Sequence, residues 1–270
     1  MELQCPLPIQ DYEAVTIGHG GGGRLSQKLI EGMFVPAFGT SSAEELHDGA
    51  RLPRPDGPVA FTTDSFVVSP LFFPGGDIGS LAVHGTTNDL AMCGARPRWL
   101  SLAFVLEEGL PLKDLWRVVV SIKKASDALG VKIVTGDTKV VERGKADGLY
   151  VNTTGLGEIV AGADIAPRRV RPGDRIVVNG PIADHGMTIL ARREGLELEG
   201  DLRSDSAALW PLVEGSLDAL GADLHCLRDA TRGGVASATN EIAQAAGVGI
   251  ELEEDDVPVR EPARAACEVF

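Results

Sequence analysis

Four aspartates stand at places in the sequence where a carboxylate could hold a metal ion. Asp64 closes the alternating run FTTDS, Asp48 lies in LHDGARL, and Asp229 lies between the apolar run LHCLR and the glycines of TRGG. Magnesium prefers oxygen ligands and is usually held by one or two carboxylates together with substrate phosphates. Any one such aspartate is more typical of a turn or a helix N-cap. As a set, Asp48, Asp64, Asp89 and Asp229 predict carboxylates that converge on a magnesium–nucleotide complex.

Asp89 is the most informative of the four, because it falls inside an apolar stripe. The segment 77–93 has helical spacing, and the residues that share one face with Asp89 are Ile78, Leu81, Ala82, Gly85 and Met92. A buried carboxylate must meet a cation, a set of donors or a metal ion, or it must take up a proton. A helix register shifted by one residue, or a capping role for Asp89, is the competing interpretation.

A run of glycines, GHGGGGR at 18–24, could bind phosphate groups. An anion needs exposed backbone N–H groups with little side-chain bulk, and Gly20 to Gly23 supply them just before the helical run LSQKLIEGMF. The run also satisfies GxGxxG, but so dense a glycine cluster matches almost any glycine pattern. A Walker A loop is excluded, because Arg24 and Leu25 stand where Lys and Ser or Thr are required. A flexible linker is the alternative.

A second turn of small residues is predicted within VTGDTKVV at 134–141. Gly136, Asp137 and Thr138 would end the apolar strand before them, with Lys139 directly beyond. Lys139 could neutralise a phosphate, or move a proton if burial lowers its pKa, although most lysines after a turn are simply solvated. The segment DATRGG likewise joins a predicted strand to a helix N-terminus, which suits an anion.

Strands and helices alternate along the whole chain, which predicts an α/β or α+β fold. Apolar or period-two runs predict strands at 59–68, 99–106, 131–135, 148–156, 175–179 and 223–228. Helical spacing appears at 77–93, 112–129, 186–194, 206–220, 233–246 and 260–269. The Pro-, Gly- and charge-rich stretch 161–174 is the expected boundary, so we predict domains at 1–165 and 166–270.

Composition excludes several classes of protein. The net charge of −14 argues against a nucleic-acid groove, and no apolar run is long enough to span a bilayer. The N-terminal residues lack the features of a signal peptide. Four scattered cysteines without a CxxC pair favour a reducing compartment, so we expect a cytoplasmic protein. Neither a GxSxG elbow nor an HExxH motif is present, and the five histidines lack metal-ligand spacing.

The motifs together resemble the hydrogenase maturation factor family HypE. From about residue 15 to the last residue, the chain carries GHGGGGR, HDGARL, FTTDSFVVSPLFFPGGDIGSLAVHGTTNDLAMCGARP, LSLAFVLEEGLP, VTGDTKVVERG, NTTGLG, DHGMTIL and LRDATRGGVA in the order and spacing of that family. PLFFPGGDIG, FVLEEGLP and GDTKVVERG are the specific parts. NDLAM and the aspartate turns alone would indicate only the wider superfamily of aminoimidazole ribonucleotide and selenophosphate synthetases.

This resemblance implies a two-domain PurM-like α/β protein. Its N-terminal sheet domain would form a homodimer and bind ATP with Mg²⁺ near the interface, and its C-terminal α/β domain would be incomplete. The family dehydrates a carbamoylated C-terminal cysteine to a thiocyanate, which supplies the cyanide ligand of NiFe-hydrogenase iron. The implied partners are the carbamoyltransferase HypF and the HypC–HypD iron carrier, with no nucleic acid or membrane.

The resemblance also suggests a role for each motif residue. Four carboxylates resemble the magnesium and phosphate ligands, namely Asp48, Asp64, Asp89 and Asp229. The residues expected near the nucleotide are Gly20, Gly21, Gly22, Gly23, Asn88, Gly136, Asp137 and Thr138. Lys139, in the GDTK motif, is the candidate for removing a proton from the carboxamide.

One departure from the family limits what the resemblance implies. Relatives continue through an Asn-Glu-Gly-Lys motif to a terminal Pro-Arg-Ile-Cys, which this sequence lacks, and Cys267 lies in a predicted interior helix. We therefore expect a C-terminally shortened chain. A catalytically incompetent module that only dimerises or binds partners is one alternative. A selenophosphate-synthetase-like enzyme is another, although His19 and Arg24 stand where that family has a reactive Cys or selenocysteine and a Lys.

Overall fold

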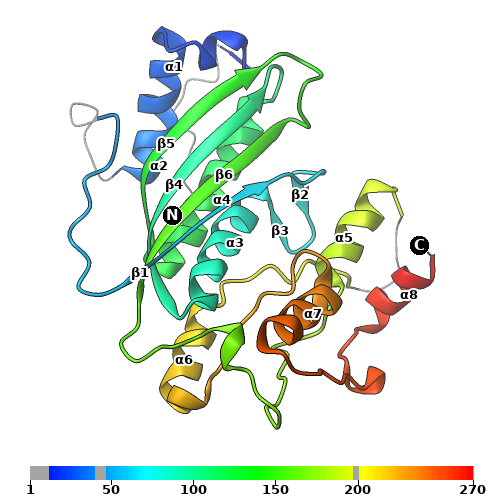
Figure 1. Cartoon of the computed structure of the whole chain (residues 1–270). Helices are drawn as coiled ribbons and strands as arrows, with labels where there is room; N and C mark the ends of the chain where they lie inside the picture. The colour runs from blue at the N-terminus through cyan, green and yellow to red at the C-terminus, as the bar shows by residue number, and fades with distance from the viewer. Residues whose placement is uncertain (1–11, 40–46, 197–200, 270) are drawn as a thin grey trace.

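The computed structural model describes residues 12–39, 47–196 and 201–269, and it shows a sheet domain joined to a smaller, mainly helical part (Figure 1). A four-stranded sheet has the order β1-β6-β4-β5. Its strands are β1 (Val59–Phe66), β4 (Ala95–Glu107), β5 (Lys132–Val141) and β6 (Leu149–Ile159). β6 runs antiparallel to both β1 and β4, whereas β5 runs parallel to β4. β1 and β5 are therefore the two edges of the sheet.

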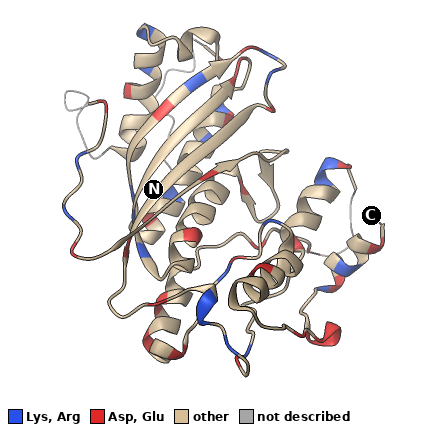
Figure 2. Cartoon of the chain, in the orientation of Figure 1, with Lys and Arg blue, Asp and Glu red and all other residues tan. Residues whose placement is uncertain are grey.

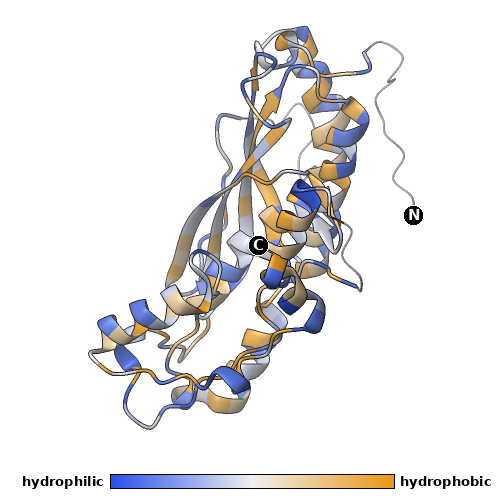
Figure 3. Cartoon of the chain, turned by 90° about the vertical axis from the view of Figure 1, so that its right-hand side faces the viewer, coloured by the Kyte–Doolittle hydropathy of each residue, from blue (hydrophilic) through white to orange (hydrophobic). Residues whose placement is uncertain are grey.

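Two long helices, α3 (Ile78–Met92) and α4 (Leu112–Leu129), cover one face of this sheet. The rotated view shows helices on one side of the strands and an open face on the other (Figure 3). The hydrophobic core lies between the layers, where Leu102 and Phe104 of β4 meet Val83 of α3 and Leu115 of α4. A short hairpin of β2 (Phe72–Phe73) and β3 (Gly76–Asp77) leads into α3.

Local sequence signals fix the ends of both helices. Asp77 caps α3, because its side chain accepts hydrogen bonds from the N–H groups of Gly79 and Ser80. α4 buries one apolar face and ends at Gly130, whose φ of 65° is the left-handed conformation that glycine adopts most readily. The predicted helix at 112–129 is confirmed to the residue, and that at 77–93 nearly so.

The N-terminal segments lie along the β5 edge of the sheet (Figure 1). They are η1 (Ile17–Gly20), α1 (Arg24–Leu29), η2 (Ile30–Phe34) and α2 (Val35–Phe38). The stacked rings of Phe34 and Phe104 join this unit to β4, with centroids 5.4 Å apart. The glycine run is thus held beside β5.

The second half of the chain is mainly helical. Its helices are α5 (Asp184–Arg193), α6 (Trp210–Leu220), α7 (Gly234–Ala246) and α8 (Glu261–Val269), with the short turns η4 (Pro167–Arg169), η5 (Gly221–Asp223) and η6 (Glu254–Asp256). All four helices confirm predicted ones. α6 packs on the first domain, where Trp210 and Val213 contact Ala91.

Two predicted strands in this half are wrong. Segments 175–179 and 223–228 belong to no strand in the described structure, and the only ladder contact nearby is an isolated bridge between Ile182 and Val259. Val177 is 87 % exposed, so its apolar side chain is not packed in a core. A strand requires a hydrogen-bonded neighbour as well as an apolar run, and the sequence pattern reports only the second requirement.

The predicted turn at 136–138 is also wrong, because β5 continues through it. Gly136, Asp137 and Thr138 pair in register with Leu102, Ala103 and Phe104 of β4. A side chain at Gly136 would collide with the Leu102 carbonyl group, so glycine permits the close strand pairing here and makes no turn.

No helix among the described residues is long and apolar enough to cross a membrane.

Candidate active site

Three of the four predicted aspartates converge where β1, α3 and the segment before α7 meet. Asp64 lies on β1, Asp89 on α3, and Asp229 in the segment before α7. Their charges act on one another: those of Asp229 and Asp64 both raise the pKa of Asp89, and that of Asp64 raises the pKa of Asp229. Residues separated by up to 165 positions thus form one cluster, which we call the aspartate cluster.

The strand–helix contact that builds this cluster depends on Gly85. A Cβ at this position would lie 2.7 Å from the Phe66 ring and 3.8 Å from Asp64 Oδ2. The absence of a side chain therefore lets β1 approach α3 and places the Asp64 carboxylate against the helix. Asp89 lies one helical turn after Gly85, and its Oδ2 accepts a hydrogen bond of 2.9 Å from the Thr62 hydroxyl of β1. Thr62 was not predicted as a site residue, although it shares a strand face with Asp64 through the two-residue repeat.

Burial is the main reason why two of these carboxyl groups are weaker acids than usual. Burial raises the pKa of Asp89. The hydrogen bond from Thr62 lowers this pKa in part, and the charges of Asp229 and Asp64 raise it further. Burial likewise raises the pKa of Asp229. Neighbouring carboxylates that repel one another in a half-buried position attract a cation. The predicted placement of Asp89 in a largely apolar stripe agrees with this.

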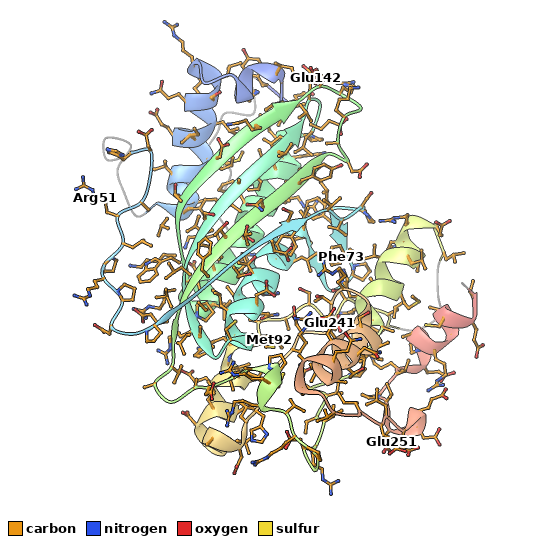
Figure 4. The ribbon with its side chains drawn as sticks, in the orientation of Figure 1. Arg51, Phe73, Met92, Glu142, Glu241 and Glu251 are labelled. Carbon is orange, nitrogen blue, oxygen red and sulfur yellow. The ribbon has the colours of Figure 1, made fainter. Side chains whose placement is uncertain are left out.

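The charge of Arg228 acts on two members of this cluster. Its charge lowers the pKa of both Asp89 and Asp229, and its guanidinium donates a 2.6 Å hydrogen bond to Glu241 of α7. Figure 4 shows Met92, at the end of α3, in the same part of the molecule as Glu241. The arginine was not singled out by sequence, because its partner lies on the following helix.

The donor set fits a magnesium ion that also has ligands outside the protein. Among residues 12–39, 47–196 and 201–269, no three His, Cys, Asp or Glu side chains are arranged to hold one metal ion by themselves. Mg²⁺ is commonly bound by one or two carboxylates, with phosphates and waters completing its octahedron. The aspartate cluster supplies carboxylates of that kind.

Asp48 is not part of the aspartate cluster in this structure. Its side chain is exposed, and it is not among the charges that shift the pKa of Asp89 or Asp229. Arg51, three residues later, lies at the outer margin of the molecule (Figure 4). The assignment of Asp48 as a metal ligand therefore stays a prediction without support from the geometry.

The glycine run forms a defined loop at the opposite edge of the sheet. His19, only 5 % exposed, accepts a 3.0 Å hydrogen bond from the Thr16 N–H group at Nδ1, and Ser26 Oγ accepts one of 3.0 Å from Gly22. A Cβ at Gly20 would lie 2.6 Å from the Val140 nitrogen, so the loop touches β5 directly. These contacts argue against the alternative that the glycine run is a flexible linker. No atom occupies the side-chain space of Gly22 or Gly23, which leaves one side of the loop open.

Lys139 lies close to this loop and on the open face of the sheet. It is 65 % exposed and forms a 2.7 Å ion pair with Asp137, and this hydrogen bond lowers the pKa of the Asp137 carboxyl group. Phe104 of β4 is buried in the core beneath the helices, and its partner in register on β5 is Thr138. Side chains alternate between the two faces of a strand, so the residues on either side of Thr138 face the other way. The side chains of Asp137 and Lys139 therefore point away from α3.

The glycine loop and the aspartate cluster are separated across the sheet of one chain. One row of paired residues runs from Asp64 through Thr153 and Leu102 to Gly136. At about 4.8 Å per strand, the three spacings amount to roughly 14 Å. Asp64 also faces α3, while Lys139 faces the open side. The two groups cannot contact the same ion within one chain.

Asn88 holds a protein segment in this structure. Its Nδ2 donates a 2.9 Å hydrogen bond to the Ala207 carbonyl group, and its Oδ1 accepts one of 2.9 Å from the Leu209 N–H group. Its predicted position beside the nucleotide is untested, but both ends of the carboxamide are occupied by the backbone before α6.

A hollow of about 460 Å³ adjoins the Asp64 end of the aspartate cluster. β1 and its continuation, α3 and α5 line it, with Phe66, Val68, Leu81 and Ile189 giving apolar walls and His185 and Arg193 the polar ones. It lies between the sheet domain and the helical part.

Two family models together match most of the chain. The N-terminal domain of AIR synthase related proteins matches residues 47–159, and the C-terminal domain matches residues 171–270. The interval between them, residues 160–170, overlaps the stretch 161–174 that the composition predicts as a boundary.

Several similar proteins are named HypE. The chain is 53 % identical over 255 residues to the carbamoyl dehydratase HypE of Azotobacter vinelandii, covering 94 % of this chain and 74 % of that protein. A crystal structure of the hydrogenase maturation protein HypE in complex with ATP superposes with a TM-score of 0.90 at 50 % identity, covering 94 % of this chain and 75 % of the other. A crystal structure of a HypE–HypF complex gives a TM-score of 0.76 at 44 % identity, covering 92 % and 78 %.

Proposed function

The chain belongs to the HypE family of the AIR synthase related proteins, and we propose that it is the ATP-dependent carbamoyl dehydratase of NiFe-hydrogenase maturation. The observation that carries this proposal is the aspartate cluster. It places half-buried carboxylates whose pKa values are raised at the junction of the two domains, where a divalent cation relieves their repulsion. A structure of a relative with ATP, similar to this chain over 94 % of its length, supports the same ligand here.

The proposed roles follow from the chemistry of amide dehydration. A carboxamide oxygen is a poor leaving group, and its phosphorylation by ATP allows phosphate to leave while the two N–H protons are lost, giving a nitrile on sulfur. Asp64, Asp89 and Asp229 would hold Mg²⁺ against the phosphates, with one or two of these carboxylates on any one ion, and the metal would supply charge neutralisation. The open N–H groups of the glycine loop would bind phosphate oxygens. Lys139, an ammonium in its ion pair with Asp137, would first lose its own proton and then, as the free amine, receive one from the carboxamide.

The separation of the glycine loop from the aspartate cluster supports a composite site in a homodimer. Because the two groups lie on opposite edges and faces of one sheet, we propose that the glycine loop and Lys139 of one subunit complete the site of the other. The open sheet face is suited to an interface: Phe61 is 70 % exposed on it, and the strands there carry few charges (Figure 2).

The proposed partners are proteins that deliver and receive the carbamoyl-derived group. A HypE–HypF complex has been observed for a protein of the same family, so a HypF-type carbamoyltransferase is the expected donor. The HypC–HypD iron carrier is the expected acceptor of cyanide. We also propose a cytoplasmic location, consistent with the free Cys93, Cys226 and Cys267.

Mass spectrometry tests this function directly. The full-length gene product is incubated with a HypF-type carbamoyltransferase, carbamoyl phosphate and Mg·ATP, and the peptide bearing the acceptor cysteine is then weighed. Loss of one water from the carbamoylated peptide, only when Mg·ATP is present, is the expected result. Lys139→Met should retain Mg·ATP binding and the carbamoyl group but lose the dehydration step. A carbamoylated peptide that keeps its water in the wild-type protein would exclude the proposed activity.

A further inference from the structure

The last part of the connection from α5 to α6, residues 203–209, is fastened along α3 by groups of both domains; we call it the strap. Ser204 donates its N–H group to the Pro74 carbonyl at 2.9 Å, and its hydroxyl lies 2.9 Å from His185 Nδ1 of α5. Farther along, the Ser206 hydroxyl lies 3.2 Å from His84 Nδ1 of α3. The strap therefore follows α3 toward the aspartate cluster.

Asn88 makes the last and most specific of these attachments. It binds the Ala207 carbonyl and the Leu209 N–H group at the same time, as a neighbouring strand would. Leu209 is the N-cap residue of α6 and makes no capping hydrogen bond with its own side chain. The carboxamide of Asn88 thus fixes the point at which α6 begins.

The path from this attachment leads to Asp229. α6 packs through Trp210 and Val213 against Ala91 of α3, and Leu227 packs against the same cluster. Asp229 follows Leu227 by two residues, and it is close enough to Asp89, the residue directly after Asn88, for its charge to raise the pKa of Asp89. α3 thus carries both Asp89 and the amide that anchors the strap, and α6 links the strap to the later segment that bears Asp229.

We propose that Asn88 is a positioning residue: by tying the strap to α3, it sets Asp229 opposite Asp89 so that the two carboxylates can serve one Mg·nucleotide complex. This inference rests on the proposed function for its ligand, but its structural part is independent of that function. It differs from a direct contact between Asn88 and the nucleotide, because the amide is already used on both sides.

Hydrogen–deuterium exchange on the ligand-free protein tests the structural part. In Asn88→Ala we expect faster exchange both in the strap around Leu209 and in the segment 224–233, by roughly tenfold if the two lost hydrogen bonds contribute as usual. Asn240→Ala is the matched control, because that exposed carboxamide binds only the Ala236 carbonyl of its own helix. Unchanged exchange in 224–233 would overturn the proposal, since the attachment would then not govern Asp229.

Calorimetry tests the consequence for the ligand. We expect wild-type protein to bind ATP more tightly with Mg²⁺ than with EDTA, and Asn88→Ala to lose most of that metal-dependent gain. Ala207→Gly combined with Ala208→Gly loosens the strap without touching α3, and should cause a similar loss that is not additive with Asn88→Ala. If Asn88→Ala alone weakens binding while strap exchange is unchanged, Asn88 is a nucleotide ligand and the proposal is wrong. If wild-type protein does not bind Mg·ATP, the proposed function fails, and the exchange data alone decide the structural part.

Discussion

Thr62 of β1 donates a 2.9 Å hydrogen bond to Asp89 of α3, and so joins an edge strand to the carboxylate that the helix presents beside it. This contact lowers the pKa of Asp89 against the larger effect of burial, which raises it. The hydrogen bond from Thr62 therefore offsets only part of the cost of burying the Asp89 carboxylate. In the absence of a cation, such an arrangement should cost stability, and a bound metal ion should recover it.

Asp229→Asn tests this cost through its pH dependence. Because the pKa of Asp229 is higher in the folded protein than in the unfolded chain, its contribution to stability is fully present below about pH 4 and is lost as the pH rises through the folded value. We therefore expect the ligand-free variant in EDTA to melt at a higher temperature than wild type at pH 7, with the difference shrinking toward pH 3. Asp255→Asn, an exposed carboxylate, is the control for scanning calorimetry. A lower melting temperature for Asp229→Asn at pH 7 would contradict the electrostatic account.

Gly20→Ala tests how the glycine loop is held. The new Cβ would lie 2.6 Å from the Val140 nitrogen and 2.9 Å from its Cβ, so the loop must move away from β5. Overpacking of this kind typically costs about 1–3 kcal/mol, which urea unfolding can measure. Gly23→Ala is the matched control, because its Cβ meets no atom within 4 Å, and it should change stability by less than about 0.5 kcal/mol. Equal effects of the two substitutions would mean that the loop does not pack on β5.

Phe61→Glu tests the proposed use of the open sheet face. Phe61 is 70 % exposed, and a charge in its place would have to be desolvated in an interface. Sedimentation should show a wild-type dimer and a monomeric variant, with weaker Mg·ATP binding if the site is composite. Val177→Glu, at an 87 % exposed apolar position in the second half, should remain dimeric. A Phe61→Glu protein that stays a dimer would place the interface elsewhere.

Arg260→Ala tests the packing of α5 on α8. Asp184 is 1 % exposed, its Oδ2 accepts hydrogen bonds from Arg260, and its Oδ1 has no partner. Loss of the guanidinium leaves a buried carboxylate without its counter-charge, so the melting temperature should fall. The double variant Asp184→Asn, Arg260→Ala should recover part of the loss. Arg264→Ala, an exposed arginine on α8, should have little effect. An equally small effect of Arg260→Ala would show that the pair does not stabilise the helical part.

Sequence predicted the helices well because their signals are local. The Asp77 cap, the apolar face of α4 and the glycine after it lie within the segments they define. Strand pairing is not local, so the sequence pattern wrongly predicts strands at 175–179 and 223–228 and a turn at Gly136, where β5 continues.

The candidate site divides in the same way. The burial of Asp89 could be inferred from its neighbours along one helix, whereas its approach to Asp64 and Asp229 follows from contacts across the fold. The partners of Asn88 lie 119 and 121 residues away, and no sequence pattern indicates them. Asp48 looked similar to the other aspartates in its local sequence, yet the fold leaves it apart.

Calorimetric titration of Mg·ATP into wild-type and Asp89→Asn protein tests the central claim most directly. The asparagine keeps the shape of the side chain and its contact with Thr62 but removes the negative charge that a metal ion requires. We predict saturable binding to wild type, binding weakened by roughly a hundredfold or more in Asp89→Asn, about 2.7 kcal/mol, and identical far-UV circular dichroism. Asp255→Asn should bind as wild type does. Unaltered Mg·ATP affinity in Asp89→Asn would contradict the account, because the aspartate cluster would then not be the metal–nucleotide site.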